Sequence, residues 1–303
     1  MTTKIEPVGI SQSKHKAAAN PAHICVRGVS LWLGRPKHRR LALDRIDLEC
    51  GKRKIMGLVG PSGSGKSTLL KTIGGLLQPD SGEVLIDGAP ASEAMRQNRF
   101  GLVFQQPVLL PWRNAEENVS FTAELVQARH GESTAPAKKA RLARAKELLD
   151  LVGLSDHSHK YPRELSGGMQ QRVSIARALM TEPDILLMDE PFSALDEVIR
   201  ERLNLTLLRI WERTNVTIVF VTHSLNEAAF LTDEIYVMGA DPGRIIDRVK
   251  SPLARPRTLE TFRTPDFAEL TMHLRYVLGG ASGDQQPQGQ DTGQPNKGNS
   301  KWN

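Results

Sequence analysis

The sequence of 303 residues predicts an α/β fold: a mixed sheet core with an antiparallel β subdomain and an inserted α-helical subdomain. Segments 55–59, 185–188 and 217–221 are continuously apolar, as expected of central parallel strands that are covered on both faces. Around 46–50 and 83–87 apolar and polar residues alternate, which is typical of half-exposed strands. Together these patterns indicate two kinds of β layer in one domain.

The remaining elements follow in chain order. Leucine and isoleucine recur at helical spacing over 66–77, directly after the first apolar strand, so a strand, a loop and a helix succeed one another. Between about 91 and 165 the helical pattern dominates, which predicts the inserted helical subdomain. Asp241-Pro242-Gly243 predicts a turn between two short strands.

The limits of the folded unit are set by composition. We expect one domain over 23–278, because no repeat of 20 to 50 residues is visible within it. Residues 1–22 have basic residues but no apolar stretch behind them, which predicts a flexible leader rather than a secretory signal. Residues 279–303, rich in Gly, Gln, Pro, Asn, Asp and Ser, predict a disordered tail.

Charge and cysteine content exclude some classes of protein. The net charge of +6 and the pI of about 9.4 permit an anionic partner without identifying it. Cys25 and Cys50 form no CxxC pair, so they are expected to be reduced thiols rather than part of a disulfide scaffold. Apolar runs stay far below the roughly 20 residues of a membrane-spanning helix, so the chain is not expected to cross a bilayer by itself.

A glycine-rich loop between the first apolar strand and its helix fits the pattern GxxxxGK[ST]. Backbone N–H groups in such a loop surround phosphate oxygens, and the helix N-terminus adds partial positive charge. Lys66 is predicted to reach the outer phosphates, and Ser67 to ligate Mg²⁺. The predicted nucleotide-binding residues here are Gly60, Pro61, Ser62, Gly63, Ser64, Gly65, Lys66, Ser67 and Thr68.

Two carboxylates end the second apolar strand. Asp189 and Glu190 would lie at the carboxyl edge of the sheet, where ligands bind in α/β folds. Beside the glycine-rich loop, Asp189 is predicted to hold Mg²⁺, and Glu190 to orient or deprotonate the water that attacks the γ-phosphate.

A second glycine-centred helix start occurs at LSGGMQQR, residues 165–172. Ser166 is placed as the N-cap of an amphipathic helix, and such a helix start is another anion-binding end. One phosphate group rarely needs two sites in one chain, so this one is expected to serve the nucleotide bound by a second copy.

These motifs resemble those of ABC ATPases over about 230 residues, in the order GPSGSGKST, Gln105, LSGGMQQR, ILLMDEP, SALD and His223. The resemblance implies the P-loop NTPase (RecA-like) fold and a head-to-tail homodimer. Each ATP would lie between the P-loop of one protomer and Ser166, Gly167 and Gly168 of the other.

The same resemblance assigns roles to single residues. Gln105 would be the Q-loop residue that senses Mg²⁺ and the attacking water, with Gln106 as the adjacent alternative. His223 resembles the switch histidine that contacts the γ-phosphate, so the implied catalytic set is Glu190, His223, Gln105 and Lys66. Asp196 resembles the D-loop residue that crosses the dimer interface.

The residue that stacks on adenine is ambiguous. The family has an aromatic residue shortly after the first strand, and the segment VSLWLG aligns Leu33 there, with Trp32 beside it. Adjacent strand residues face opposite sides, so only one of the two can serve, and Trp32 is our prediction.

The apolar segment Val108–Trp112 after the Q-loop indicates a partner. LLPW followed by Glu117-Asn118-Val119 is similar to the nitrate, sulfonate and taurine importer branch. The resemblance implies an ATPase that uses ATP and Mg²⁺ on the cytoplasmic face of the inner membrane, docked on a permease and linked indirectly to a periplasmic or surface solute-binding protein. The branch resemblance suggests a solute of nitrate, sulfonate or taurine type, without identifying it. The alternatives are a free-standing ATPase acting on nucleic acid and a regulatory module that binds ATP without turnover; no nucleic-acid partner is expected.

Overall fold

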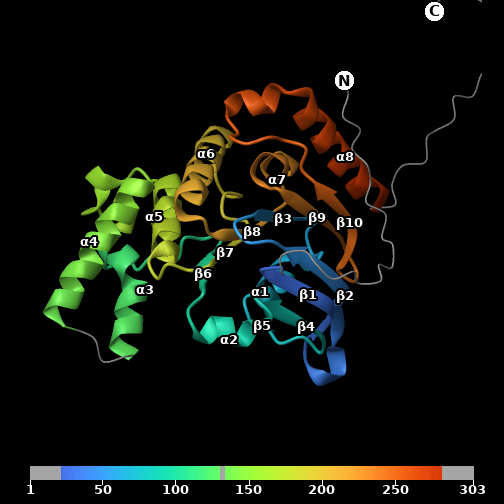
Figure 1. Cartoon of the computed structure of the whole chain (residues 1–303), viewed down its shortest axis with the longest axis horizontal. Helices are drawn as coiled ribbons and strands as arrows, with labels where there is room; N and C mark the ends of the chain where they lie inside the picture. The colour runs from blue at the N-terminus through green and yellow to red at the C-terminus, as the bar shows by residue number, and fades with distance from the viewer. Residues whose placement is uncertain (1–21, 130–133, 282–303) are drawn as a thin grey trace, which may run out of the picture.

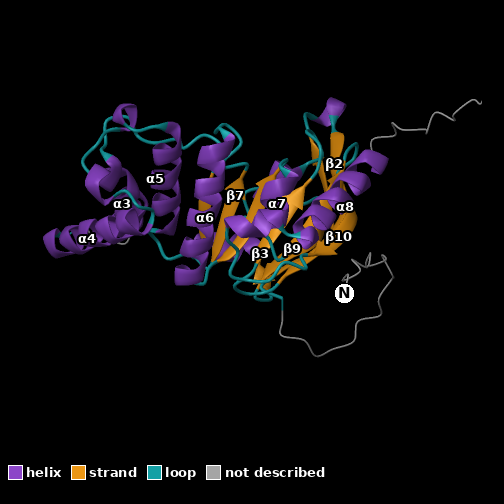
Figure 2. Ribbon diagram, turned by 90° about the horizontal axis from the view of Figure 1, so that it is seen from above, coloured by secondary structure: helices purple, strands orange, loops and turns teal. Residues whose placement is uncertain are grey.

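The computed structural model describes residues 22–129 and 134–281. Two sheets lie face to face, and a separate group of helices extends to one side (Figure 1). The larger sheet has the strand order β10-β9-β3-β8-β7-β6, and the smaller has the order β2-β1-β4-β5. Figure 2 shows the helical group, α3 to α5, standing beside the edge of the larger sheet.

The larger sheet is mixed, as predicted. Strands β6, β7, β8, β3 and β9 pair in parallel, and β10 pairs antiparallel with β9. Its strands are β3 (Ile55–Val59), β6 (Phe100–Val103), β7 (Ile185–Asp189), β8 (Thr217–Thr222), β9 (Glu234–Gly239) and β10 (Arg244–Lys250). The turn at 241–243 joins β9 to β10, which confirms that prediction.

The continuously apolar strands are buried on both faces. In β3, Ile55 and Val59 face one hydrophobic cluster with α5, α6, α7 and α8, whereas Met56 and Leu58 face another with α1 and the smaller sheet. Burying both faces removes the polar side of each strand, which is why alternation is absent from these segments.

The smaller sheet is antiparallel. It consists of β1 (Ile24–Leu33), β2 (Arg40–Cys50), β4 (Ser81–Ile86) and β5 (Ala89–Pro90). Along its strands the apolar residues point into the cluster with α1, and the polar residues that alternate with them point to solvent. This arrangement places α1 between the two sheets, directly after β3.

The helices fall into two groups (Figure 1). Those covering or flanking the sheets are α1 (Lys66–Ile73), α2 (Ala91–Arg96), α6 (Glu197–Thr214), α7 (Leu225–Leu231) and α8 (Pro265–Ala281), and those of the helical subdomain are α3 (Ala115–Arg129), α4 (Ala135–Leu151) and α5 (Gly167–Leu179). Short 3-10 helices are η1 (Pro36–His38), η2 (Ser155–His157), η3 (Pro162–Glu164) and η4 (Leu259–Arg263).

Three sequence expectations need correction. The helix predicted over 66–77 ends at Ile73, because the glycine pair 74–75 follows and Gly75 adopts a φ of +70°. The helical insert predicted over about 91–165 is wrong for β6, since 100–103 pair with β7; four residues are too few to show a strand period. Helix α8 runs to residue 281, three residues into the predicted tail, whereas the rest of that tail and residues 1–21 of the predicted leader lie outside the described residues.

Candidate active site

The glycine-rich loop 60–65 lies between β3 and α1, as its sequence predicts. Glycine is required at two points: a Cβ on Gly60 would lie 2.5 Å from the carbonyl oxygen of Met238, and Gly65 adopts a φ of +87° with a neighbouring Leu43 side chain 2.9 Å from its Cβ position. The tight path of the loop therefore requires residues without a Cβ at positions 60 and 65.

Lys66 begins α1 and turns back over this loop. Its Nζ donates hydrogen bonds of 2.9 Å to the carbonyl oxygens of Gly60 and Pro61. Burial lowers the pKa of Lys66, while the nearby charges of Glu190 and Asp189 act in the opposite direction. The ammonium group is thus held at the mouth of the loop, within the field of two carboxylates.

Ser67 and Asp189 meet across the sheet edge. The Ser67 hydroxyl donates to Asp189 Oδ1 at 2.7 Å, although the two residues are 122 positions apart. Strands β3 and β7 run parallel on either side of β8, so the helix after β3 and the last residue of β7 share the carboxyl edge. This places two oxygen donors side by side.

Glu190 and His223 form the next contact along that edge. His223 follows β8, and its Nδ1 lies 2.9 Å from Glu190 Oε2. Glu190 has a φ of +46°, an unusual backbone for a non-glycine residue, and its N–H donates to Val221 O at 3.0 Å. The backbone is therefore bent to turn this carboxylate toward the histidine.

The predicted signature residues lie on a different part of the molecule. Ser166 caps α5, and its Oγ accepts from Met169 N at 3.4 Å. Ser166 and Gly167 are exposed, and Gly168 packs against α6, where a Cβ would lie 2.8 Å from Ile199 Cγ2. Helix α5 stands with α3 and α4, apart from α1, so the structure does not bring this loop to the P-loop of its own chain (Figure 1).

The structure leaves Gln105 outside these contacts. It lies exposed in the loop after β6, next to Gln106, and no hydrogen bond joins it to another described residue. The loop itself is tied to α5, because Gln171 Nε2 donates to Phe104 O at 3.0 Å. Trp32 is 44% exposed, whereas Leu33 packs against the core of the smaller sheet, so these two residues do face opposite sides.

Comparison with known proteins identifies the family. Residues 43–193 match the family described as ABC transporter. An uncharacterized ABC transporter ATP-binding protein of Methanocaldococcus jannaschii, MJ0412, is 46% identical, covering 78% of this chain and 85% of that protein. The taurine import ATP-binding protein TauB of Rhizobium johnstonii is 43% identical, and the match covers 81% of this chain and 90% of that protein.

The chain belongs to the ABC transporter family, as one of its ATP-binding proteins. The dimeric ATP-binding cassette MJ0796, solved in a post-hydrolysis state with ADP and Pi, is 32% identical with a TM-score of 0.65, covering 76% of this chain and 100% of that one. Both the predicted family and the predicted fold class are confirmed, and this ABC protein is an ATPase.

The site of this ABC ATPase suits a nucleotide and a magnesium ion. Hydroxyl and carboxylate oxygens, as paired in Ser67 and Asp189, are the ligands Mg²⁺ prefers. The Ser64 hydroxyl in the glycine-rich loop is buried without a hydrogen-bond partner among the described residues, so the loop retains an unsatisfied polar group. The donor set therefore fits both groups.

Two charged residues near the site were not anticipated from the sequence. Glu227 is 4% exposed on α7, four residues after His223, and Arg200 of α6 approaches it. The available signal was an acidic residue within the apolar segment LNEAAFL, because a buried carboxylate requires partners.

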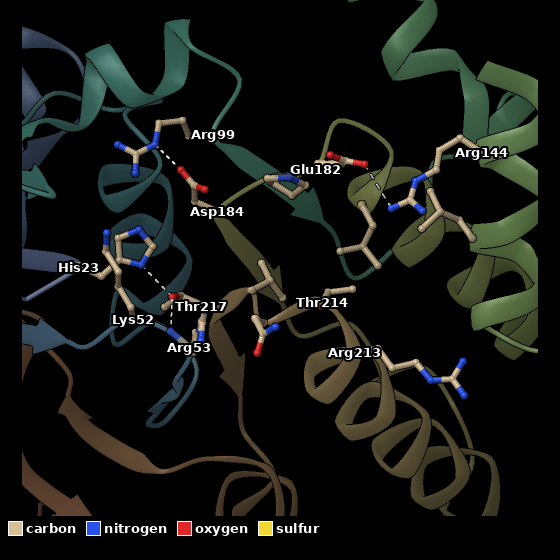
Figure 3. A pocket seen from close by; sticks show the side chains of 15 residues that line it. His23, Lys52, Arg53, Arg99, Arg144, Glu182, Asp184, Arg213, Thr214 and Thr217 are labelled. Carbon is tan, nitrogen blue, oxygen red and sulfur yellow. Dashed lines mark hydrogen bonds and ion pairs between the residues drawn. The ribbon is translucent and has the colours of Figure 1, made fainter. Parts of the chain in front are cut away.

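A cavity of about 550 Å³ at the opposite edge of the larger sheet is not part of this site (Figure 3). It lies at the amino ends of β7 and β8, where His23 Nδ1 is 2.8 Å from Thr217 Oγ1. Arg99 pairs there with Asp184, and Arg144 lies 3.4 Å from Glu182, whereas the side chains of Arg53 and Arg213 make no ion pair with another described residue.

Proposed function

We propose that the chain is the ATP-hydrolysing subunit of an ABC importer. It would work as a head-to-tail homodimer on the cytoplasmic face of the membrane, docked on a permease that receives its solute from a binding protein. The observation that supports the chemistry is the alignment of Lys66, the Ser67–Asp189 pair and the Glu190–His223 pair along one sheet edge.

Each residue of that edge has one task in the proposed reaction, in which ATP and water give ADP and phosphate. Lys66 neutralises phosphate charge, and Ser67 with Asp189 would hold Mg²⁺, which supplies charge stabilisation when bound. Glu190 accepts the proton of the attacking water, and His223, in contact with it, holds the carboxylate in place. Gln105, exposed and unattached, would complete the set, and Trp32 would stack on adenine because its ring faces solvent.

The dimer is proposed because the two anion-binding helix starts are separated. The N-terminus of α5, with Ser166, Gly167 and Gly168, lies in the helical subdomain away from α1. A two-fold related copy could place this end over the triphosphate of its partner, with Asp196 at the same interface. The N-terminus of α5 in each copy would then contact the P-loop of the other copy, so that one dimer closes two nucleotide sites.

The loop that follows β6 offers a surface for a permease. Val108 is 64% exposed and Trp112 is 70% exposed. Such large apolar groups favour a protein partner over water. No helix among the described residues is long and apolar enough to span a membrane.

This loop has a defined shape although it is exposed. Asn118 is fully buried and makes hydrogen bonds with the N–H and carbonyl of Leu110 and with the carbonyl of Arg113, at 2.8 to 3.1 Å. Arg177 of α5 donates to the carbonyls of Pro107 and Val108 at 2.7 and 2.8 Å. A push on the loop would therefore be transmitted to α3 and α5, the second of which carries the signature residues.

A small sulfonate is the proposed solute. Two of the similar proteins are named as import ATP-binding proteins for taurine and for aliphatic sulfonates, the latter 38% identical over 242 residues. The solute contacts would lie on the permease and the binding protein, so the class rests on this similarity alone.

The test is transport by the assembled complex. The tagged chain, co-expressed with the permease from its own genome, is purified in detergent and reconstituted in proteoliposomes with the binding protein and labelled taurine. We expect ATP-dependent uptake. Trp112→Ala should lower uptake and complex yield at least fivefold and leave the ATPase rate of the isolated subunit unchanged. The control Tyr276→Ala removes an 81% exposed aromatic on α8 and should leave uptake, complex yield and the ATPase rate unchanged. Hydrolysis stimulated by DNA or RNA, without complex formation, would instead support an ATPase of nucleic-acid metabolism.

A further inference from the structure

Glu227 lies buried between two loops of the site, on the first turns of α7. One loop follows β8 and carries His223; the other is the D-loop, residues 193–196, which precedes α6. Helices α6 and α7 lie beside each other on the same face of the larger sheet (Figure 1). A carboxylate that is 4% exposed at this junction needs compensation from both sides.

The first carboxylate oxygen holds the loop of His223. The Thr222 hydroxyl accepts the N–H of Ser224 at 2.9 Å, so its own proton is left to donate to Glu227 Oε2, with which it makes a short contact. Thr222 and Ser224 are the two neighbours of His223 in the chain. Glu227 thereby fixes the backbone on both sides of the histidine that contacts Glu190.

The second carboxylate oxygen faces the D-loop. Glu227 Oε1 lies 3.6 Å from Arg200 Nε, and Arg200 Nη2 donates to the carbonyl of Leu195 at 2.9 Å. Leu195 is a D-loop residue whose side chain approaches Gly167 of the signature segment, 3.3 Å from where a Cβ would be. One arginine therefore connects the carboxylate to the loop predicted to meet the second protomer.

The ion pair is close but lacks a hydrogen bond. Both Arg200 Nε and Glu227 Oε1 are buried without a hydrogen-bond partner among the described residues. Burial raises the pKa of Glu227, and the Thr222 hydroxyl and the Arg200 charge oppose this rise. A small approach of the D-loop would complete the hydrogen bond between the two groups, whereas a retreat would also separate their opposite charges.

We propose that Glu227 is a positioning residue for hydrolysis: together with Arg200 it joins the D-loop at Leu195 to the loop of His223, so that the two loops move as one unit. The inference rests on the proposed hydrolytic role of Glu190 and His223. Dimer contact at the D-loop would then set the histidine and, through it, the carboxylate of Glu190. Neither Glu227 nor Arg200 touches the nucleotide in this scheme.

The test is a double-mutant cycle on the purified subunit. Glu227→Gln keeps a carbonyl oxygen for Thr222 but presents an NH₂ group to Arg200. Arg200→Lys keeps the positive charge but has one nitrogen in place of three, so it cannot serve Glu227 and Leu195 together. We expect each variant to lower kcat for MgATP hydrolysis at least fivefold, with the affinity of the monomer for a fluorescent ATP analogue within twofold of wild type.

The double variant distinguishes coupling from two separate defects. Its kcat should be at least about threefold higher than the product of the two single effects predicts, because residues acting as one unit are not additive. Glu234→Gln is the matched control: it alters another part-buried Arg–Glu pair, with Arg248 at 2.6 Å, far from the site, and should leave kcat unchanged.

Three results would overturn the proposal: multiplicative single effects, an unchanged kcat, or a loss of nucleotide affinity that parallels the loss of rate. If Glu227→Gln does not fold, Arg200→Lys alone decides, because the Arg200 side chain is partly exposed. In that variant kcat must fall while the nucleotide affinity stays within twofold of wild type. Glu190→Gln is run alongside. If that variant hydrolyses ATP at the wild-type rate, the proposed chemistry fails instead, whatever the cycle shows.

Discussion

Replacing Glu190 by glutamine is the most direct perturbation of the proposed chemistry. Glutamine has the same shape, so it can keep the 2.9 Å contact with His223 Nδ1. The backbone, with its φ of +46° and its N–H bond to Val221 O, need not change. The substitution therefore removes one property, the ability to accept a proton.

The expected loss follows from that single change. A positioned general base contributes about 10²- to 10⁴-fold. We expect kcat to fall at least about 100-fold, which corresponds to roughly 2.7 kcal/mol of transition-state stabilisation. Nucleotide affinity should not fall, because the variant removes a negative charge close to the phosphate site, where Lys66 already experiences the field of Glu190.

Phosphate release under multiple turnover measures kcat, and fluorescence anisotropy of a labelled ATP analogue measures affinity. Glu182→Gln is the matched control: this glutamate also has a left-handed backbone, with a φ of +50°, but lies by the opposite sheet edge. A Glu190→Gln rate within tenfold of wild type, with Glu182→Gln unchanged, would show that Glu190 is not the base.

Two further predictions concern the second half-site and the stability of the fold. Ser166→Arg should abolish ATP hydrolysis by the dimer yet leave the nucleotide affinity of the monomer within twofold of wild type. The control Ser166→Thr keeps the N-cap and should retain most activity. Loss of ATP binding by monomeric Ser166→Arg would place this loop in its own protomer's pocket. Burial lowers the pKa of His23 below its ordinary value near 6.5, with Asp87 acting in the opposite direction, so the unfolded state binds the proton first and stability should fall as the pH drops below about 6.5. His23→Gln should flatten this dependence in urea unfolding at pH 7.5 and 5.5, and an unchanged slope would contradict the assignment.

The sequence by itself determined the parts whose signal is local. Continuous apolar runs predicted β3, β7 and β8 nearly to the residue, and the glycine-rich pattern predicted the loop that lies between β3 and α1. Such features depend on side-chain period, backbone freedom and capping over a few neighbouring residues, and these can be judged along the chain.

Only the tertiary structure decided which distant residues meet. It assigned β6 to the larger sheet, because a four-residue strand is recognised by its pairing with β7 and not by its own pattern. It showed Trp32 facing solvent and Leu33 facing the core. The register of β1 against β2 shifts three times, so strict alternation along the strand does not predict which face each residue takes. It also revealed Glu227 with Arg200, because a buried charge is understood from its partners in space, and these come from another helix 27 residues earlier in the chain.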